Sequence, residues 1–392
     1  MSGVSCKLVL VLVLAEGLAG WNSARAQPQD HAETPELTSQ RLRGPGWWPT
    51  RGDGAREEFV GTAACAACHK QIALTQRETP MAHAAAKAAE TEALRSNPML
   101  KFSTPPFQTV ISSNRAASNY SVSGGGETIS GKLLWSIGAG VKGQTFLVDY
   151  LGIWFESQLS YFPSTGGLDI TPEHPRGTPQ FLESAFGAPQ SDQAAQQCFA
   201  CHTTASTVRR QFDPDHATPG ITCEACHGPG VRHVKAMRTN QFKTGMEAIV
   251  NPGSFGAVDL VGFCGACHRA PLDVTSAKDF TPLNIRFQPY RLSKSRCWSR
   301  PDRRITCVAC HNPHEPLVRE AGFYDAKCLA CHAAAGTRAT VDNLPTGKPL
   351  SCPVSGERCV TCHMPKYPDP QFHGSFTDHD IRIVRPGDPY PL

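Results

Sequence analysis

The pattern of hydrophobic and polar residues divides the chain into distinct segments. An apolar run at 8–14 follows Lys7 and falls short of the roughly 20 residues that a membrane span needs. Residues 80–96, rich in Ala with Lys and Glu, predict a helix. Residues 100–165 hold alternating and aromatic stretches broken by glycines and contain no cysteine, which predicts a small β-sheet insertion. No later segment is long and apolar enough to cross a membrane.

The N-terminal apolar run has the features of a secretory signal peptide. Ala24 and Ala26 form a small-x-small cleavage site after it, and Glu16 argues against the alternative of an uncleaved membrane anchor. We therefore expect residues 1–26 to be removed, leaving no transmembrane anchor and a periplasmic or secreted protein. Residues 27–58 are polar and rich in Pro and Gly, which predicts a linker.

The chain contains 17 Cys and 15 His, and most of the cysteines occur in seven Cys-x-x-Cys-His blocks. This block is the signature of c-type haem attachment, in which two thiols add to the haem vinyl groups and the adjacent histidine becomes the proximal iron ligand. Zinc ribbons do not require a histidine after every cysteine pair. We therefore expect seven covalently attached haem c groups. The attachment cysteines are Cys65, Cys68, Cys198, Cys201, Cys223, Cys226, Cys264, Cys267, Cys307, Cys310, Cys328, Cys331, Cys359 and Cys362; the proximal histidines are His69, His202, His227, His268, His311, His332 and His363.

The other histidines supply candidates for the second axial ligand. His31 lies in the predicted linker and is set aside. Seven candidates then remain for seven iron atoms, namely His83, His174, His216, His233, His314, His373 and His379. These numbers favour iron held mostly by two histidines, although one or two of the seven histidines being surface residues remains an open alternative. Two imidazoles leave no open position on the iron, an arrangement that suits electron transfer.

Short spacings restrict which histidines can share an iron. His311 and His314 are three residues apart, an extended reach of at most roughly 10 Å, and a chain this short cannot wrap around the edge of a porphyrin. His314 should therefore bind a different haem from His311. The same argument applies more weakly to His227 and His233. Pairs of this kind would hold two haems side by side and predict a stack of haems.

The spacing of the motifs predicts the organisation of the fold. Residues 59–190 hold the first motif and the β-rich insertion, and residues 191–392 form a hexahaem cytochrome c region. We expect a mainly α fold with many loops, packed around the haem stack, because the porphyrins themselves supply apolar surface. The 38 Lys and Arg against 34 Asp and Glu form no basic stripe, so nucleic acid is not indicated as a partner.

Several short motifs occur between residues 59 and 385. They are Phe59–Cys65 with Met81-Ala-His83, Trp135–Gly140, Ile221–Gly230 with His233, Thr306–His314, Cys362–Pro365 and Phe376–His379. Through these motifs the sequence resembles the multihaem c-type cytochromes of the cytochrome c-552/c-554 type. The resemblance implies second-ligand roles for His83, His233, His314 and His379, with His373 close behind, whereas His174 and His216 match no motif of this family.

Three functions are consistent with these features. The first is an extracytoplasmic electron carrier in a respiratory chain, whose partners would be other cytochromes or a membrane quinol oxidase or reductase. The second is a multihaem oxidoreductase with one open haem, acting on nitrogen or sulfur oxyanions or hydroxylamine. The absence of a Cys-x-x-Cys-Lys site from the sequence lowers this option. The third is a haem subunit of a larger extracellular or outer-membrane conduit. The first function is favoured, which predicts no catalytic residues.

Two cysteines remain after the motifs and Cys6 of the signal peptide are set aside. Cys297 and Cys352 each precede a haem motif in a compartment that permits disulfides. The sequence therefore predicts a Cys297–Cys352 disulfide, with two thiols or a thiolate iron ligand as the alternatives.

Overall fold

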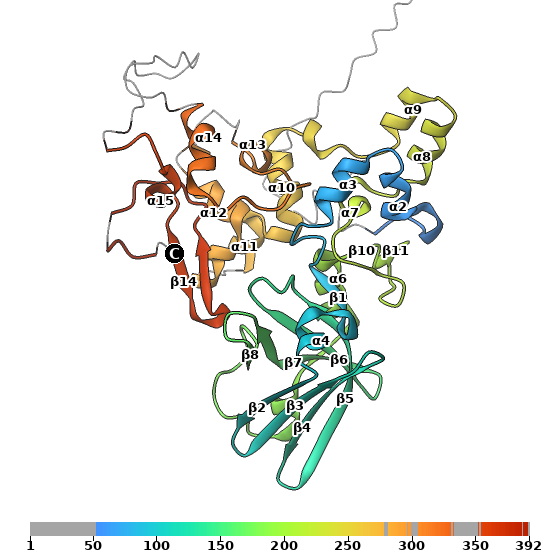
Figure 1. The fold of residues 1–392 in the computed structure, drawn as a ribbon, viewed down its shortest axis with the longest axis vertical. Helices are drawn as coiled ribbons and strands as arrows, with labels where there is room; N and C mark the ends of the chain where they lie inside the picture. The colour runs from blue at the N-terminus through green and yellow to red at the C-terminus, as the bar shows by residue number, and fades with distance from the viewer. Residues whose placement is uncertain are drawn as a thin grey trace, which may run out of the picture.

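The computed structural model places a β-sheet at one end of the protein and short helices at the other (Figure 1). The predicted signal peptide, residues 27–51 of the predicted linker and Cys331 lie outside the described residues. The structure describes residues 52–277, 281–295, 297–298, 305–330, 332, 352, 354–385 and 387–390.

The sheet is antiparallel and follows the order of the chain. Its main path is β2-β3-β4-β5-β6-β7-β8, with β1 added to β5 and β9 added to β7. Consecutive strands pair as hairpins, so the sheet is built from local connections. The strands are β1 (Ala85–Lys87), β2 (Met99–Thr104), β3 (Phe107–Ser113), β4 (Ser118–Gly124), β5 (Glu127–Ile137), β6 (Gln144–Tyr150), β7 (Ile153–Phe162), β8 (Gly167–Ile170) and β9 (Gly187–Gln190).

Alternating side chains give the sheet an apolar interior. In β3 and β4 every second residue is buried at the start of the strand, among them Ile111, Tyr120 and Val122. Phe146 and Leu159 join them from the neighbouring strands in one core cluster. The sheet curls until β2 lies against β8, although the two strands are not hydrogen-bonded neighbours. The result is a nearly closed barrel that is filled by its own side chains.

Two predictions for this region were wrong in extent. The β part was expected to be a small insertion at 100–165, but the sheet runs from Ala85 to Gln190 and is a substantial part of the fold. The helix expected over 80–96 is reduced to α4 (Glu92–Ser96). Residues 85–87 pair with Trp135–Ile137 instead, because tertiary packing outweighs the helix propensity of alanine.

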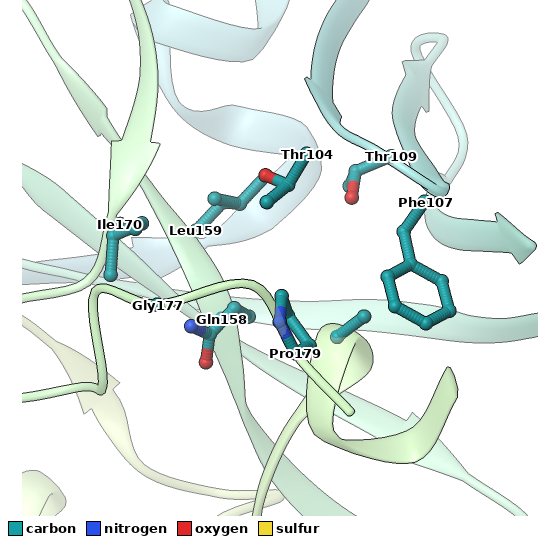
Figure 2. A pocket seen from close by; sticks show the side chains of 9 residues that line it. Thr104, Phe107, Thr109, Gln158, Leu159, Ile170, Gly177 and Pro179 are labelled. Atoms are coloured by element: carbon teal, nitrogen blue, oxygen red, sulfur yellow. The ribbon is translucent and has the colours of Figure 1, made fainter. Parts of the chain in front are cut away.

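A small cavity lies inside the curled sheet (Figure 2). Phe107 and Thr109 of β3 line it on one side, and Leu159 and Ile170 of β7 and β8 line it on the other. Its volume of about 10 Å³ has room for roughly one water molecule. The interior at this point is therefore a packed core and does not accommodate a haem or another organic ligand.

The rest of the chain forms short helices joined by turns. Two further strands, β14 (Lys366–Asp369) and β15 (Gly374–Thr377), form an antiparallel hairpin near the C-terminus (red in Figure 1). Shorter two-residue strands occur at β10 (Thr203–Thr204), β11 (Thr207–Val208), β12 (Gln211–Phe212) and β13 (Thr218–Pro219). The helices are α2 (Gly61–Ala66), α3 (Lys70–Gln76), α5 (Leu182–Phe186), α6 (Asp192–His202), α7 (Cys223–His227), α8 (Val231–Arg238), α9 (Phe242–Glu247), α10 (Ala257–His268), α11 (Pro271–Ala277), α12 (Gln288–Lys294), α13 (Cys307–Cys310), α14 (Asp325–Leu329) and α15 (Cys359–His363).

Aromatic residues join the sheet to the helical part. Phe199 of α6 is fully buried. Its ring centroid lies 4.9 Å from that of Trp135 and 5.9 Å from that of Trp154, and both contacts are edge to face. Leu147 and Ala217 complete the cluster. Helix α6 carries the second Cys-x-x-Cys-His block, so this contact fixes that block against the sheet. Within the described residues no helix has the length and apolar character needed to span a membrane.

Candidate haem-binding sites

The seven Cys-x-x-Cys-His blocks are called the first to the seventh motif in chain order. Each begins within or directly after a short helix. In the first, fifth and sixth motifs the backbone N–H of the histidine donates to the carbonyl of the first cysteine, at 2.8 Å for His69, 2.9 Å for His311 and 2.8 Å for His332. The motif is thus wound into one helical turn, which places residues three apart on the same side. This is the local geometry that lets two thiols and one imidazole meet a single porphyrin.

The rings of several proximal histidines are oriented by backbone carbonyls. Nδ1 of His202 lies 3.0 Å from the Ala84 carbonyl oxygen, Nδ1 of His227 lies 2.8 Å from that of Val250, and Nδ1 of His363 lies 2.8 Å from that of Arg382. A carbonyl oxygen can only accept, so Nδ1 carries the proton in these bonds and Nε2 keeps its lone pair. An imidazole in this tautomer is the usual metal-binding form.

Two of the second-ligand candidates have the same arrangement. Nδ1 of His233 donates to the Gly245 carbonyl at 2.7 Å, and Nδ1 of His379 donates to the Thr377 carbonyl at 3.1 Å. Their Nε2 atoms are likewise left with a lone pair for a metal.

Three of the candidates face a proximal histidine of another motif. The ring centroids are 6.4 Å apart for His69 and His233, 5.9 Å for His227 and His314, and 6.3 Å for His311 and His379. A metal bonded to two imidazole nitrogens at roughly 2 Å each separates the ring centroids by about 6 Å. All three pairs have this spacing, so the residues present fit an iron held between two imidazoles.

The pairs obey the constraint that short spacing imposes. His311 and His314 face different partners, as do His227 and His233. The segments His311–His314 and His227–His233 are too short to surround a porphyrin. Each of them instead brings two neighbouring motif sites together.

The four remaining candidates are placed differently. His83 and His216 are exposed, and Nδ1 of His216 lies 2.8 Å from Asp213. His174 has Nδ1 at 2.9 Å from Gln158 and Nε2 at 3.2 Å from Glu156, so both of its ring nitrogens contact polar side chains of β7. Nε2 of His373 lies 2.7 Å from Asp169 of β8. The structure therefore brings none of these four into the facing arrangement of the three pairs.

Burial favours the neutral imidazole at several sites. It lowers the pKa of His202, His268, His311 and His314, and it lowers the pKa of His379 to about 4. Only a neutral imidazole can donate a lone pair to iron, so these histidines do not have to lose a proton before they bind metal near neutral pH.

Cysteines of different motifs also meet. A hydrogen bond from Cys65 of the first motif lowers the pKa of Cys223 of the third motif to about 6. Comparable thiol contacts join Cys201 to Cys267, Cys264 to Cys307 and Cys328 to Cys359. Sites far apart in the sequence are therefore direct neighbours in space.

The sequence did not single out the charged residues that hold these sites together. Glu224, inside the third motif, accepts hydrogen bonds from the backbone N–H groups of Val60, Gly61 and Gly230 at 2.8–2.9 Å. Asp325 accepts from the N–H groups of Arg358 and Cys359 at 2.7 and 2.9 Å. The position of Glu224 between two motif cysteines was the one available signal.

A buried ion pair supports the segment that carries His379. Arg291 of α12 makes two hydrogen bonds to Asp378, at 2.8 and 3.0 Å, and both side chains are fully buried. Burial opposes the charge of Asp378, but the bonds from Arg291 and Arg382 lower its pKa below the usual value. The hydroxyl of Ser295 adds a bond to the carbonyl of His379 at 3.0 Å. This network fixes the backbone on both sides of the histidine.

The predicted Cys297–Cys352 disulfide is absent from the structure. Cys352 is exposed, whereas Cys297 is partly buried. A disulfide requires the two Cβ atoms to lie about 4 Å apart with suitable orientation, which an even number of cysteines cannot guarantee.

Comparison with known proteins adds an independent line of support. Residues 215–333 match the family model described as cytochrome c3, and residues 174–228 match the one described as cytochrome c554 and c-prime. A relative from Shewanella baltica (strain OS185), the multihaem cytochrome MtrA, is 23% identical over 216 residues, which cover 50% of this chain and 60% of the relative. The chain thus spans less than two thirds of that protein's length.

Among solved structures, the outer cell wall cytochrome OcwA aligns over 83% of this chain and 80% of its own, with 16% identity and a TM-score of 0.46. The two family models together cover five of the seven motifs entirely, the second to the sixth, and part of the helical region around them. Covalently bound haem c is implied by both families. The chain is therefore similar, over residues 174–333, to multihaem c-type cytochromes.

Proposed function

We propose that the protein is a heptahaem c-type cytochrome that transfers electrons outside the cytoplasm. The observation that carries this proposal is the set of three imidazole pairs, each joining a proximal histidine to a histidine from another part of the chain at 5.9–6.4 Å between centroids. The number of haems follows from the seven motifs. The proximal ligands would be the motif histidines, and His233, His314 and His379 would be second ligands at the first, third and fifth motifs.

The haem would supply a reversible one-electron change at its iron. At the three pairs the chain would hold an iron between two oriented imidazoles: carbonyls lie against Nδ1 of His227, His233 and His379, and the Arg291–Asp378 pair fixes the segment around the last of these. A site of this kind moves little when its charge changes and offers no position to a substrate. These properties favour electron transfer over catalysis.

The location and partners follow from the predicted signal peptide and the redox chemistry. Cleavage after Ala26 would release the mature protein into the periplasm or beyond, with residues 27–58 as a linker. The sheet-bearing region 59–190 and the hexahaem region 191–392 would act as its two parts. Other cytochromes or a membrane quinol oxidase or reductase would exchange electrons with the haems.

Haem quantification together with spectroscopy of the purified holoprotein tests this proposal. Seven haems per chain and ferric spectra dominated by low-spin iron are expected. A substantially smaller ratio of haem to protein would contradict the haem complement. Replacement of His314 by Ala should convert one low-spin centre to high spin, whereas the matched change of the exposed His216 to Ala should leave the spectrum unchanged.

A multihaem oxidoreductase is the second candidate. The observation in its favour is that His174 and His373 contact carboxylate and amide side chains of the sheet, so they do not face a proximal histidine. At least two of the seven irons would then lack a second histidine. A high-spin ferric signal that changes on addition of nitrite or hydroxylamine would support this candidate, and an entirely low-spin spectrum that neither compound alters would exclude it.

A further inference from the structure

We propose that the haem motifs form a three-armed network. The third, fourth and fifth motifs make a central trio. The first motif, the second motif and the sixth and seventh motifs together form three separate arms attached to it. This inference rests on the proposed haem complement and adds to it the order in which the sites are connected. The alternative is a single row in which the motifs follow one another in space.

The first arm joins the central trio at the third motif. Glu224 of the third motif accepts from the N–H groups of Val60 and Gly61, at 2.9 and 2.8 Å, and so holds the start of α2, which leads into the first motif. His233, directly after the third motif, faces His69 of the first at 6.4 Å. The second motif lies between these two in the sequence but takes no part in these contacts.

The second arm joins the trio at the third and fourth motifs. Just after the second motif, the hydroxyl of Thr204 accepts from the N–H of Thr222, directly before the third motif, at 2.9 Å. The Cys201 thiol donates to the carbonyl of Ala266 at 3.8 Å, and α6 packs beside α10. Helix α6 also packs Phe199 against Trp135 of the sheet, with 4.9 Å between the ring centroids. The outer end of this arm therefore lies against the barrel.

The central trio is connected on all three sides. His227 of the third motif faces His314, which belongs to the fifth motif's segment, at 5.9 Å. Cys226 of the third motif packs with Phe263 and Ala266 of α10, the helix of the fourth motif. Helix α10 also lies against α13 of the fifth motif. Each motif of the trio thus contacts the other two.

The third arm joins the trio at the fifth motif. His379 faces His311 at 6.3 Å, and its segment is tied to the seventh motif, since the His363 ring and the Arg382 carbonyl are 2.8 Å apart. Tyr324, just before the sixth motif, contacts His311 with its ring centroid at 5.6 Å. Asp325 then bonds the sixth motif to Cys359 of the seventh.

This connectivity gives the network three ends. An electron that enters through any one arm reaches the trio and can leave through either of the other two. A row of sites has only one entrance and one exit. The protein would therefore exchange electrons at three separate surfaces, one of them beside the barrel.

The iron positions in the holoprotein test the network. Anomalous scattering at the iron absorption edge locates each iron in a crystal, and the chain traced through the same map assigns each iron to its motif. We expect the irons to fall into three groups that neighbour each other only through the third, fourth and fifth irons. These groups are the first iron, the second iron, and the sixth iron with the seventh. A single row would overturn the proposal, as would neighbouring haems from any two different arms.

The same map separates this inference from the proposed function. Fewer than seven irons would contradict the haem complement, whereas the arrangement of the irons present would still decide between three arms and a row. Seven irons in a row would leave the proposed function intact and refute the network.

Discussion

The sheet and the helical region differ in what holds them together. The sheet has a continuous apolar core of its own, which includes Ile111, Tyr120, Phe146 and Leu159 at 2% exposure or less. In the helical region the buried apolar side chains, among them Leu260, Val274 and Leu292, are spread over several short helices. The sheet is therefore stabilised by burial of its own side chains, whereas we expect the helical region to depend in addition on haem surfaces between its helices.

The largest expected effect comes from withholding haem. In protein secreted by a host without haem-attachment enzymes, the sheet should stay folded and the helical region should lose its structure. Hydrogen exchange read by mass spectrometry should show protection retained in β3–β7 and lost in α7, α10 and α13. Persistent protection of α10 without haem would show that the helical region has a sufficient core of its own.

A substitution that creates a cavity where the sheet packs against the helical region should have the next largest effect on stability. Replacing Trp135, which is 1% exposed, by Ala removes the surface that Phe199 packs against. The free energy of unfolding of the sheet should fall by about 3–5 kcal/mol. Denaturant titration followed by far-ultraviolet circular dichroism, which reports the backbone, measures this change. Haem content should not change, because the motifs are chemically intact. A matching loss of several haems would mean that the regions do not fold separately.

A smaller effect is expected from Arg291→Lys. Lysine keeps the charge beside Asp378 but cannot form both bonds of the guanidinium, so the local stability should fall by about 2–3 kcal/mol. The change should appear only in holoprotein, as a raised exchange rate around 377–382 and an altered low-spin signal from the haem bound by His379. An identical effect in the haem-free chain would contradict the dependence of this region on haem.

The smallest expected effect is that of Glu224→Gln. The amide keeps one acceptor but loses the charge that receives three backbone N–H groups, at a cost of about 1.5 kcal/mol. Exchange should rise in α2 and α7 and remain unchanged in α14 and α15. Glu57→Gln, at an exposed ion pair with Arg209, is the control and should have almost no effect.

The two regions also differ in how far the sequence predicts them. Covalent haem attachment demands fixed spacing, so the motif cysteines and histidines can be identified without a structure. The partners of those histidines depend on contacts through space. The number of histidines alone does not separate His233 from His174, and the family resemblance that favours His233 does not say which proximal histidine it faces. Only the fold shows that the first faces His69 and the second is bonded to Glu156.

In the sheet the limits of prediction lie at its outer strands. Strands β3, β4 and most of β5 alternate between buried and less buried residues, and the predicted range covers them. Strands β1, β8 and β9 have only three or four residues each and too little alternation to be recognised. Their pairing is determined by the neighbouring strand, which is why Ala85–Lys87 adopts an extended form despite its helical composition.

The three imidazole pairs have a consequence for the assembly of the protein. In each pair the second histidine comes later in the chain than the first: His233 after His69, His314 after His227, and His379 after His311. If the chain is exported from its N-terminus, each of these haems is attached before its second ligand has crossed the membrane. Early haems would pass through a reactive, half-ligated stage, and arrival of the C-terminal hairpin segment would close the last of these three sites.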